Sequence, residues 1–153
     1  MRGLQPLGDG GYRLRLERHE RELLDALAAE LEQLVRADDD SVARLFPSAY
    51  KDDAAADEEY RRLTRGSLTE GRLRAIRTVR DTVQGERLDQ SEADAWCTAP
   101  NDMRLVLGER LGVTDDLYER ELDRRDPRAP ELAIYAWLTW LQASVIDALA
   151  SRL

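Results

Sequence analysis

Apolar residues recur at every third or fourth position through most of this 153-residue chain, a spacing that predicts amphipathic helices. The clearest case is residues 17–37, where Leu23, Leu27, Leu31 and Leu34 fall on one side of a helix. The same pattern, bounded by residues that begin or end helices, predicts further helices at 53–65, 67–83, 89–112 and 115–125.

The stretch Leu132–Leu149 departs from this pattern, because apolar residues surround its helical wheel instead of following one side. It contains Trp137 and Trp140, and its only charged residue is Asp147. A helix that is apolar all round is usually buried on most sides. We therefore expect this helix at the centre of the fold, packed against the apolar face of residues 96–111.

The N-terminal residues follow a different period. Tyr12, Leu14 and Leu16 alternate with arginine, which is typical of a half-buried strand. The glycine-rich residues 8–11 precede them and predict a turn, with Leu4–Leu7 as the partner strand. A lone hairpin is marginally stable in water, so we expect it to lie on the helices or to pair with another chain.

Glycine and proline mark the expected helix boundaries. Gly66 is expected to end one helix, and the Ser67–Glu70 capping box is expected to begin the next. Pro100 lies inside a helical pattern, where it removes a backbone donor. We expect a kink there, or two helices that meet near Ala99.

Together these patterns predict an all-α fold in a single domain over residues 1–153. About five or six helices form a bundle around the buried C-terminal helix, with the helical core at 17–153 and a small β-hairpin at 1–16. A chain of this length buries roughly 68–70% of its unfolded surface, so it forms a core without disulfides or a structural metal.

The net charge of −8 at pH 7 changes the range of expected partners. Because phosphate contacts need a basic surface, this charge argues against nucleic acid and against an anionic membrane surface as binding partners.

Residues 132–149 approach the length of a membrane span, but their polar side chains are costly at membrane depth, which favours a core helix. One cysteine and the lack of an apolar signal segment at the start favour the cytoplasm.

Catalytic and metal chemistry have little support in this sequence. His19 is the only histidine, so a zinc site would lack its usual partners. No phosphate-binding loop or serine nucleophile motif is present. We therefore expect no metal, no cofactor and no enzymatic activity.

Cys97 is expected to be a buried, inert thiol. The alternative is a redox-active thiol that forms a disulfide with another molecule.

One basic stretch stands out in this acidic chain, since seven arginines and one acidic residue lie between Arg61 and Arg80. The arginines form either a solvated face paired with neighbouring carboxylates or a docking surface for an acidic protein partner. DNA is a weaker third option, because the stretch has no recognition-helix signature. The candidate partner-binding residues are Arg61, Arg62, Arg65, Arg74 and Arg77.

A polar group opens an otherwise apolar helical segment just after Pro100. It consists of Asn101, Asp102 and Arg104, and Asp102 near a helix N-terminus is favourable by dipole. We expect Asp102 and Arg104 to pair, with Asn101, in a partly buried structural network. A ligand or partner site is the alternative.

Three stretches, RLFPSAYKDDAAADEEYRRLTRGSL, NDMRLVLGERLGV and YAWLTWLQASVIDAL, resemble an actinobacterial family of small helical proteins classed as a domain of unknown function. One branch of that family consists of AosR-like oxidative-stress regulators. The resemblance implies a compact helical fold and a regulatory role through protein contact, with an alternative sigma factor as the partner in that branch. The redox signal of the branch is associated with a cysteine pair. Cys97 is alone, so that mechanism does not carry over.

We therefore expect a non-enzymatic regulatory or adaptor protein that acts through protein contacts in stress-linked transcription control. Two alternatives stay open. One is a helical domain that binds a small molecule in a pocket between Trp96, Trp137 and Trp140. The other is a homodimeric structural module joined through the hairpin or through an apolar helix face.

Overall fold

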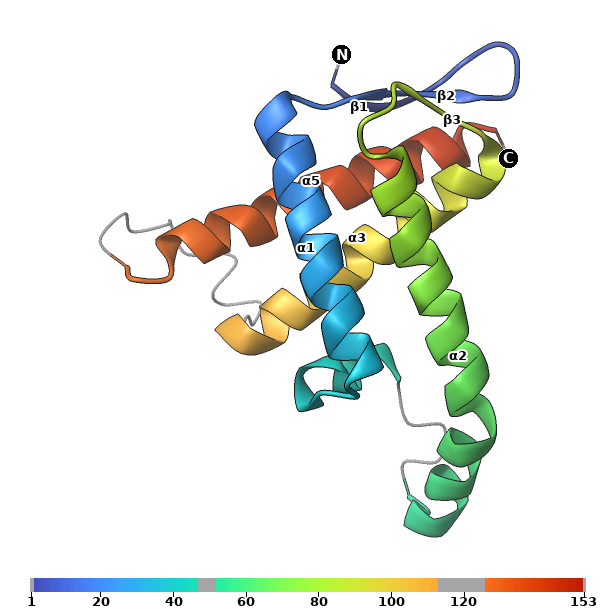
Figure 1. Cartoon of the computed structure of the whole chain (residues 1–153), viewed down its shortest axis with the longest axis vertical. Coiled ribbons are helices and arrows are strands. Elements are labelled where there is room, and N and C mark those ends of the chain that lie inside the picture. Colours follow the sequence, from blue (N-terminus) through green and yellow to red (C-terminus); the bar gives the residue numbers. More distant parts are fainter. Residues whose placement is uncertain (1, 47–51, 113–125, 153) are drawn as a thin grey trace.

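The computed structural model describes residues 2–46, 52–112 and 126–152. Helices dominate it, and a small antiparallel sheet lies at one end (Figure 1). The elements in chain order are β1 (Gly3–Pro6), β2 (Tyr12–Arg15), α1 (Arg18–Arg36), the 3₁₀ helix η1 (Asp40–Leu45), α2 (Ala54–Thr82), β3 (Arg87–Leu88), α3 (Gln90–Leu111) and α5 (Ala129–Ala150).

The predicted all-α class is confirmed, but the described residues hold four α-helices instead of five or six. One difference lies at Gly66, which was expected to end a helix and instead lies inside α2. Glycine costs only about 1 kcal/mol in a helix interior, a penalty that a 29-residue helix absorbs. The predicted helix at 115–125 lies outside the described residues.

Helix α3 begins where the sequence predicted and continues through Pro100. Its predicted start is confirmed, because the Asp89 side chain accepts from the Glu92 N–H while the Glu92 side chain accepts from the Asp89 N–H. Pro100 does not divide the element, which continues as one α-helix to Leu111. Trp96 and Met103, on either side of the proline, are both buried, so packing holds the helix together there.

The predicted hairpin is confirmed, with Leu4 opposite Leu14 and Pro6 opposite Tyr12. A third strand, β3, was missed because it is only two residues long. It pairs with β2 and gives the sheet order β1-β2-β3.

Two arginines fasten this sheet to the helices. Arg21 of α1 donates to the carbonyl oxygen of Leu14 in β2 at 3.3 Å and to that of Val83, at the end of α2, at 2.7 Å. Arg152, just after α5, donates to the carbonyl oxygens of Leu7 and Gly11 at 2.6 Å each and stacks on the Tyr12 ring. The planar guanidinium suits this role because it presents several donors in a fixed geometry.

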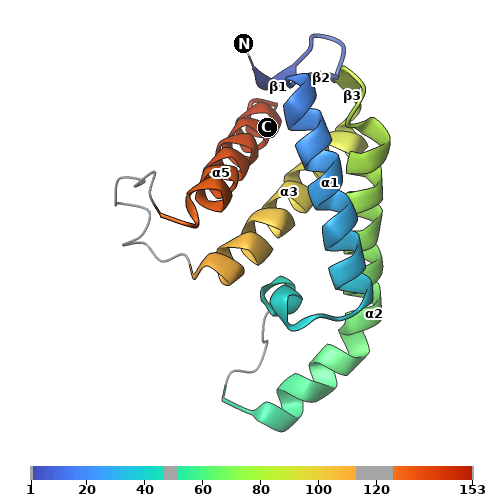
Figure 2. The same ribbon diagram turned by 60° about the vertical axis from the view of Figure 1, so that its left-hand side comes forward.

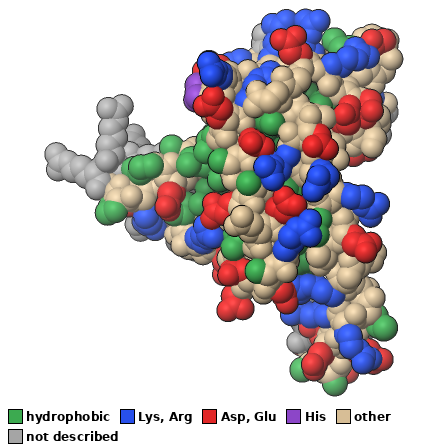
Figure 3. Space-filling view, viewed as in Figure 1, with side chains coloured by type: hydrophobic (Ala, Val, Ile, Leu, Met, Phe, Trp, Pro, Cys, Tyr) green, Lys and Arg blue, Asp and Glu red, His purple; other side chains and the backbone are tan. Residues whose placement is uncertain are grey.

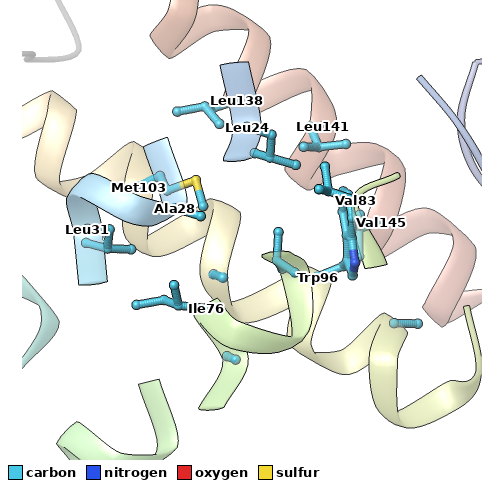
Figure 4. Packing of buried hydrophobic residues seen from close by; sticks show 14 of the residues in the cluster. Leu24, Ala28, Leu31, Ile76, Val83, Trp96, Met103, Leu138, Leu141 and Val145 are labelled. Atoms are coloured by element: carbon cyan, nitrogen blue, oxygen red, sulfur yellow. The ribbon is translucent and has the colours of Figure 1, made fainter. Parts of the chain in front are cut away.

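Helix α3 is the central element of the fold. Figure 2 shows it between α5 on one side and the α1–α2 pair on the other. It packs most extensively against α5 and α2, which confirms the predicted pairing with the C-terminal helix. Figure 4 shows Trp96 and Met103 of α3 among apolar side chains from α1, α2 and α5.

Helix α5 differs from the expectation that it is buried on most sides. Its buried residues are confined to one side of the helix, which faces the core, namely Leu138, Leu141, Val145 and Ala148. Trp140 and Ile146 are 37% and 47% exposed on the other side. By length and composition alone α5 could cross a membrane. The apolar composition therefore predicted the helix, but it did not predict which sides of α5 are buried against the other elements.

Candidate partner-binding surface

The basic stretch lies along α2, where arginine side chains follow the right-hand side of the face in Figure 3. The lower part of α2 runs past the end of α1 in Figures 1 and 2. Its apolar side chains have little cover there, since Tyr60 is 39% and Leu63 is 73% exposed. This half of α2 is thus both charged and incompletely packed.

Several of the arginines are neutralised by carboxylates. Arg61 pairs with Asp57 at 3.2 Å, and Arg65 pairs with Asp38. The Arg65 guanidinium also stacks 3.8 Å from the centre of the Phe46 ring. These residues belong to a solvated, charge-paired face.

Glu32 of α1 holds two further arginines of α2. Arg80 lies 3.2 Å from its carboxylate, and Arg77 approaches only to 3.9 Å. The hydrogen bond from Arg36 is the main reason that the pKa of Glu32 lies below its ordinary value; burial opposes this, and Arg80 adds to it. Glu32 therefore stays ionised near neutral pH.

The remaining positive charge gathers around Arg74. Its side chain is exposed and makes no hydrogen bond or ion pair within the described residues. An open groove of about 440 Å³, here called the α2 groove, is lined by Arg36, Glu70, Leu73, Arg74 and Arg77. Arg62 is also exposed, with Glu59 only 4.0 Å away. Of the five candidate arginines, Arg74 and Arg77 thus share a concave surface.

The polar group that opens the NDMRLVLG segment is divided between two neighbouring helices. Arg104 donates to Asn101 Oδ1 at 2.9 and 3.3 Å and reaches the Tyr135 hydroxyl of α5 at 3.4 Å. Asp102 instead faces Arg72 of α2, so the expected pair of Asp102 with Arg104 does not form. The motif thus joins α3 to both α5 and α2.

Gly108, in the same motif, is required by the close approach of α5. A Cβ atom at this position would lie 3.0 Å from Cε2 of the Tyr135 ring. Such a contact is tighter than ordinary van der Waals packing, so a larger side chain would push α5 away from α3.

Asp102 is a buried carboxylate with incomplete hydrogen bonding. Arg72 Nη1 donates to its Oδ1 at 2.6 Å, and Arg72 Nη2 donates to the Leu45 carbonyl oxygen at 2.6 Å. Asp102 Oδ2 and Arg72 Nε have no hydrogen-bond partner within residues 2–46, 52–112 and 126–152. Burial raises the pKa of Asp102 above its ordinary value, although the charge and hydrogen bond of Arg72 act in the opposite direction.

Glu20 is a second buried carboxylate, and it was not among the predicted site residues. It accepts from Trp137 Nε1 at 2.6 Å, from the Glu17 N–H at 2.8 Å and from Arg2. Burial alone would raise the pKa of Glu20, but these three donors outweigh it and lower the pKa. The Glu17–Glu20 spacing of a capping box was readable in the sequence, whereas Trp137 lies 117 residues away.

The three indoles do not form a common pocket. Trp96 is fully buried and donates to Thr82 Oγ1 at 2.8 Å, whereas Trp137 donates to Glu20. Trp140 lies under the Arg2 guanidinium at the surface. Among the main cavities of the described residues, none is bordered by Trp96 or Trp137. The hypothesis of a tryptophan-lined ligand pocket is therefore not retained.

Residues 1–149 match the family described as a domain of unknown function, DUF2017. The chain belongs to the DUF2017 family. Two relatives, from Mycobacterium tuberculosis and Mycobacterium bovis, are named oxidative stress regulator AosR and are 31% identical to it over 128 residues. This match covers 72% of the chain and 58% of each relative, so the chain spans less than two thirds of their length. No solved structure matches it.

Cys97 of this DUF2017 chain is free and half-buried on α3. Burial raises the pKa of its thiol, the Asp94 charge adds to this, and the 3.8 Å contact from Gln142 Nε2 opposes it. Thiolate formation is therefore disfavoured near neutral pH. Among the described residues, no group of three histidine, cysteine, aspartate or glutamate side chains could hold a metal ion.

Proposed function

We propose that this protein is a non-enzymatic cytoplasmic regulator of the oxidative stress response, and that the α2 groove binds the protein partner through which it acts. The name of the AosR relatives supports the regulatory part of the proposal. The observation that carries the binding part is Arg74, which lies beside Arg77 and Leu73 in a groove and has no ion pair with any residue that the structure describes. The occupant is an acidic amphipathic helix of the partner.

Charge and helical spacing support this occupant. Leu63, Glu70, Arg74 and Arg77 succeed one another at intervals of seven, four and three residues, which places them on one side of α2. Carboxylates of a partner would complement the arginines, while its apolar side chains would cover Leu63. The family resemblance implies an alternative sigma factor as the partner, and we include it in the proposal.

The proposed regulation depends on contact rather than on disulfide formation. Cys97 is the only cysteine of the chain, so it has no partner for an intramolecular disulfide. The elevated pKa of its thiol also disfavours rapid oxidation.

Binding is tested with purified alternative sigma factors from the native cell and the Arg74→Glu/Arg77→Glu variant. Because two favourable charge contacts become repulsive, we expect affinity to fall by about tenfold or more, equivalent to about 1.4 kcal/mol. The Arg13→Glu/Arg18→Glu variant is the matched control, since it changes the net charge equally at exposed sites elsewhere. Equal affinity of both variants would exclude the α2 groove as the binding surface.

The regulatory part needs a cellular experiment. Deletion of the gene should reduce survival in peroxide, and the wild-type gene should restore it. The Arg74→Glu/Arg77→Glu gene should fail to do so at an equal protein level. A deletion strain that responds to peroxide normally would contradict the proposed function.

A further inference from the structure

The outer side of α5 is an apolar face that the described residues leave uncovered. Six of its residues, spaced alternately by four and three positions, form a seam along the helix. Four seam residues are exposed and two are partly buried. The seam consists of Leu132, Ala136, Thr139, Ala143, Ile146 and Ala150.

We propose that this seam packs against the same seam of a second copy of the chain, with the two α5 helices antiparallel around a twofold axis. In a symmetric pair of this kind the same surface serves both partners, so it must be complementary to itself. This surface is separate from the α2 groove, and the proposal does not depend on the proposed function.

The sizes of the seam residues provide that self-complementarity. With the axis at Leu141, Ala136 comes level with Ile146 of the second copy, and Thr139 comes level with its Ala143. Leu132 in turn comes level with Ala150 of the second copy. Each layer therefore combines a small side chain with a larger one, and the alanines at every seventh position allow the helices to approach closely.

Charge favours the same register. Asp147 borders the seam, is exposed and has no ion pair among the described residues. Arg2, which already donates to Glu20 through Nη2, extends over the Trp140 ring at 5.2 Å and is half-exposed on the same side. In the antiparallel pair, Asp147 lies within about two helical turns of Trp140 of the second copy, which is within reach of its Arg2. The twofold axis produces this complementary contact twice.

The edge of the sheet is unsuited to joining two copies. The Leu4 N–H, which points away from β2, is occupied by Ser144 Oγ at 3.1 Å. Pro6 lies next on this edge and has no N–H to donate. A strand from a second copy would therefore find few donors there, whereas the seam of α5 is open.

Light scattering coupled to size-exclusion chromatography tests the dimer with the full chain. The wild type is expected to be a dimer at micromolar concentration, and Ala143→Arg is expected to be a monomer because it places a charge in the seam. Glu22→Arg, an exposed change on α1, is the control and should remain dimeric. Circular dichroism checks that all three proteins are folded.

Cysteine cross-linking tests the antiparallel register in a Cys97→Ser background. Thr139→Cys and Ala143→Cys should each cross-link poorly alone, because each lies opposite the other position. A mixture of the two proteins should form a disulfide-linked dimer. Equally efficient cross-linking of each single variant with itself would contradict the antiparallel pair.

Three other results would overturn the proposal. The first is a wild type that stays monomeric, including the case in which it floats with phosphatidylglycerol vesicles through α5. The second is a dimer that survives Ala143→Arg. The third is loss of the dimer in Arg74→Glu/Arg77→Glu, since that variant alters only the α2 groove.

Discussion

Glu20 and Asp102 are both buried carboxylates that face an arginine, yet their pKa values move in opposite directions. Glu20 lies where β1, α1 and α5 meet and has a lowered pKa. Asp102 lies where α3 meets α2 and has a raised pKa. Their exposed fractions are similar, at 4% and 2%, but the Asp102 carboxylate lies deeper among protein atoms, so burial raises its pKa more strongly.

The number of donors adds to this difference. Glu20 receives hydrogen bonds from Arg2, Trp137 and the Glu17 N–H. From the part of the chain that the structure describes, Asp102 receives one, from Arg72, and its Oδ2 receives none. An arginine alone does not compensate a carboxylate for the loss of water, whereas several donors on both oxygens do.

Removal of Arg72 should have the largest effect on stability. Arg72→Ala leaves Asp102 without a counter-charge and removes the bond to the Leu45 carbonyl oxygen. We expect a loss of about 3 kcal/mol in the free energy of unfolding at pH 7, measured with urea. The double variant Arg72→Ala/Asp102→Asn should recover part of this loss. A double variant as unstable as the single one would show that the buried charge is not the cause.

Removal of the Glu20 charge should have an intermediate effect. Glu20→Gln keeps one acceptor for Trp137 but loses the charge-assisted bonds, so we expect a loss of about 2 kcal/mol at pH 7. Because the folded-state pKa lies below the ordinary 4.5, the stability from this charge is present above pH 4.5 and is lost as the pH falls through the folded-state pKa. The wild type and Glu20→Gln should therefore converge in stability on acidification. A constant difference at all pH values would contradict the role of the charge.

Local signals in the sequence were sufficient for much of the fold. The leucine spacing predicted α1, the alternation around Tyr12 predicted the hairpin, and the helical pattern at 89–112 predicted α3. Each of these depends on residues close together in the chain. β3 was missed because two residues are too few to show a period.

Contacts between distant residues could not be read from one sequence. The arginines of α2 were visible, but the neutralisation of Arg77 and Arg80 depends on Glu32 of α1. Only the folded chain shows that Arg74 forms no ion pair with the described residues. The apolar character of α5 was equally clear. Which side of that helix is covered depends on how α3 and β1 pack against it, and composition carries no such information.

Replacement of Asp102 by asparagine should have the smallest effect and the opposite dependence on pH. Because the folded-state pKa lies above the ordinary 3.8, the folded chain favours the protonated carboxyl of Asp102, and ionisation weakens the fold. The stability from the protonated form is fully present below pH 3.8 and is lost as the pH rises through the folded-state pKa.

Asp102→Asn removes that ionisation and keeps an acceptor for Arg72, although the guanidinium then lacks a full counter-charge. We expect a loss of about 1 kcal/mol at pH 7 in urea unfolding, and less decline in stability than the wild type between pH 4 and pH 7. Glu20→Gln should instead approach the wild type in stability as the pH falls below 4.5, so the two variants differ from the wild type with opposite dependences on pH. If Asp102→Asn lowered the free energy of unfolding as much as Arg72→Ala, the charged form of Asp102 would be stabilised by its surroundings, as that of Glu20 is. The proposed difference between the two carboxylates would then be wrong.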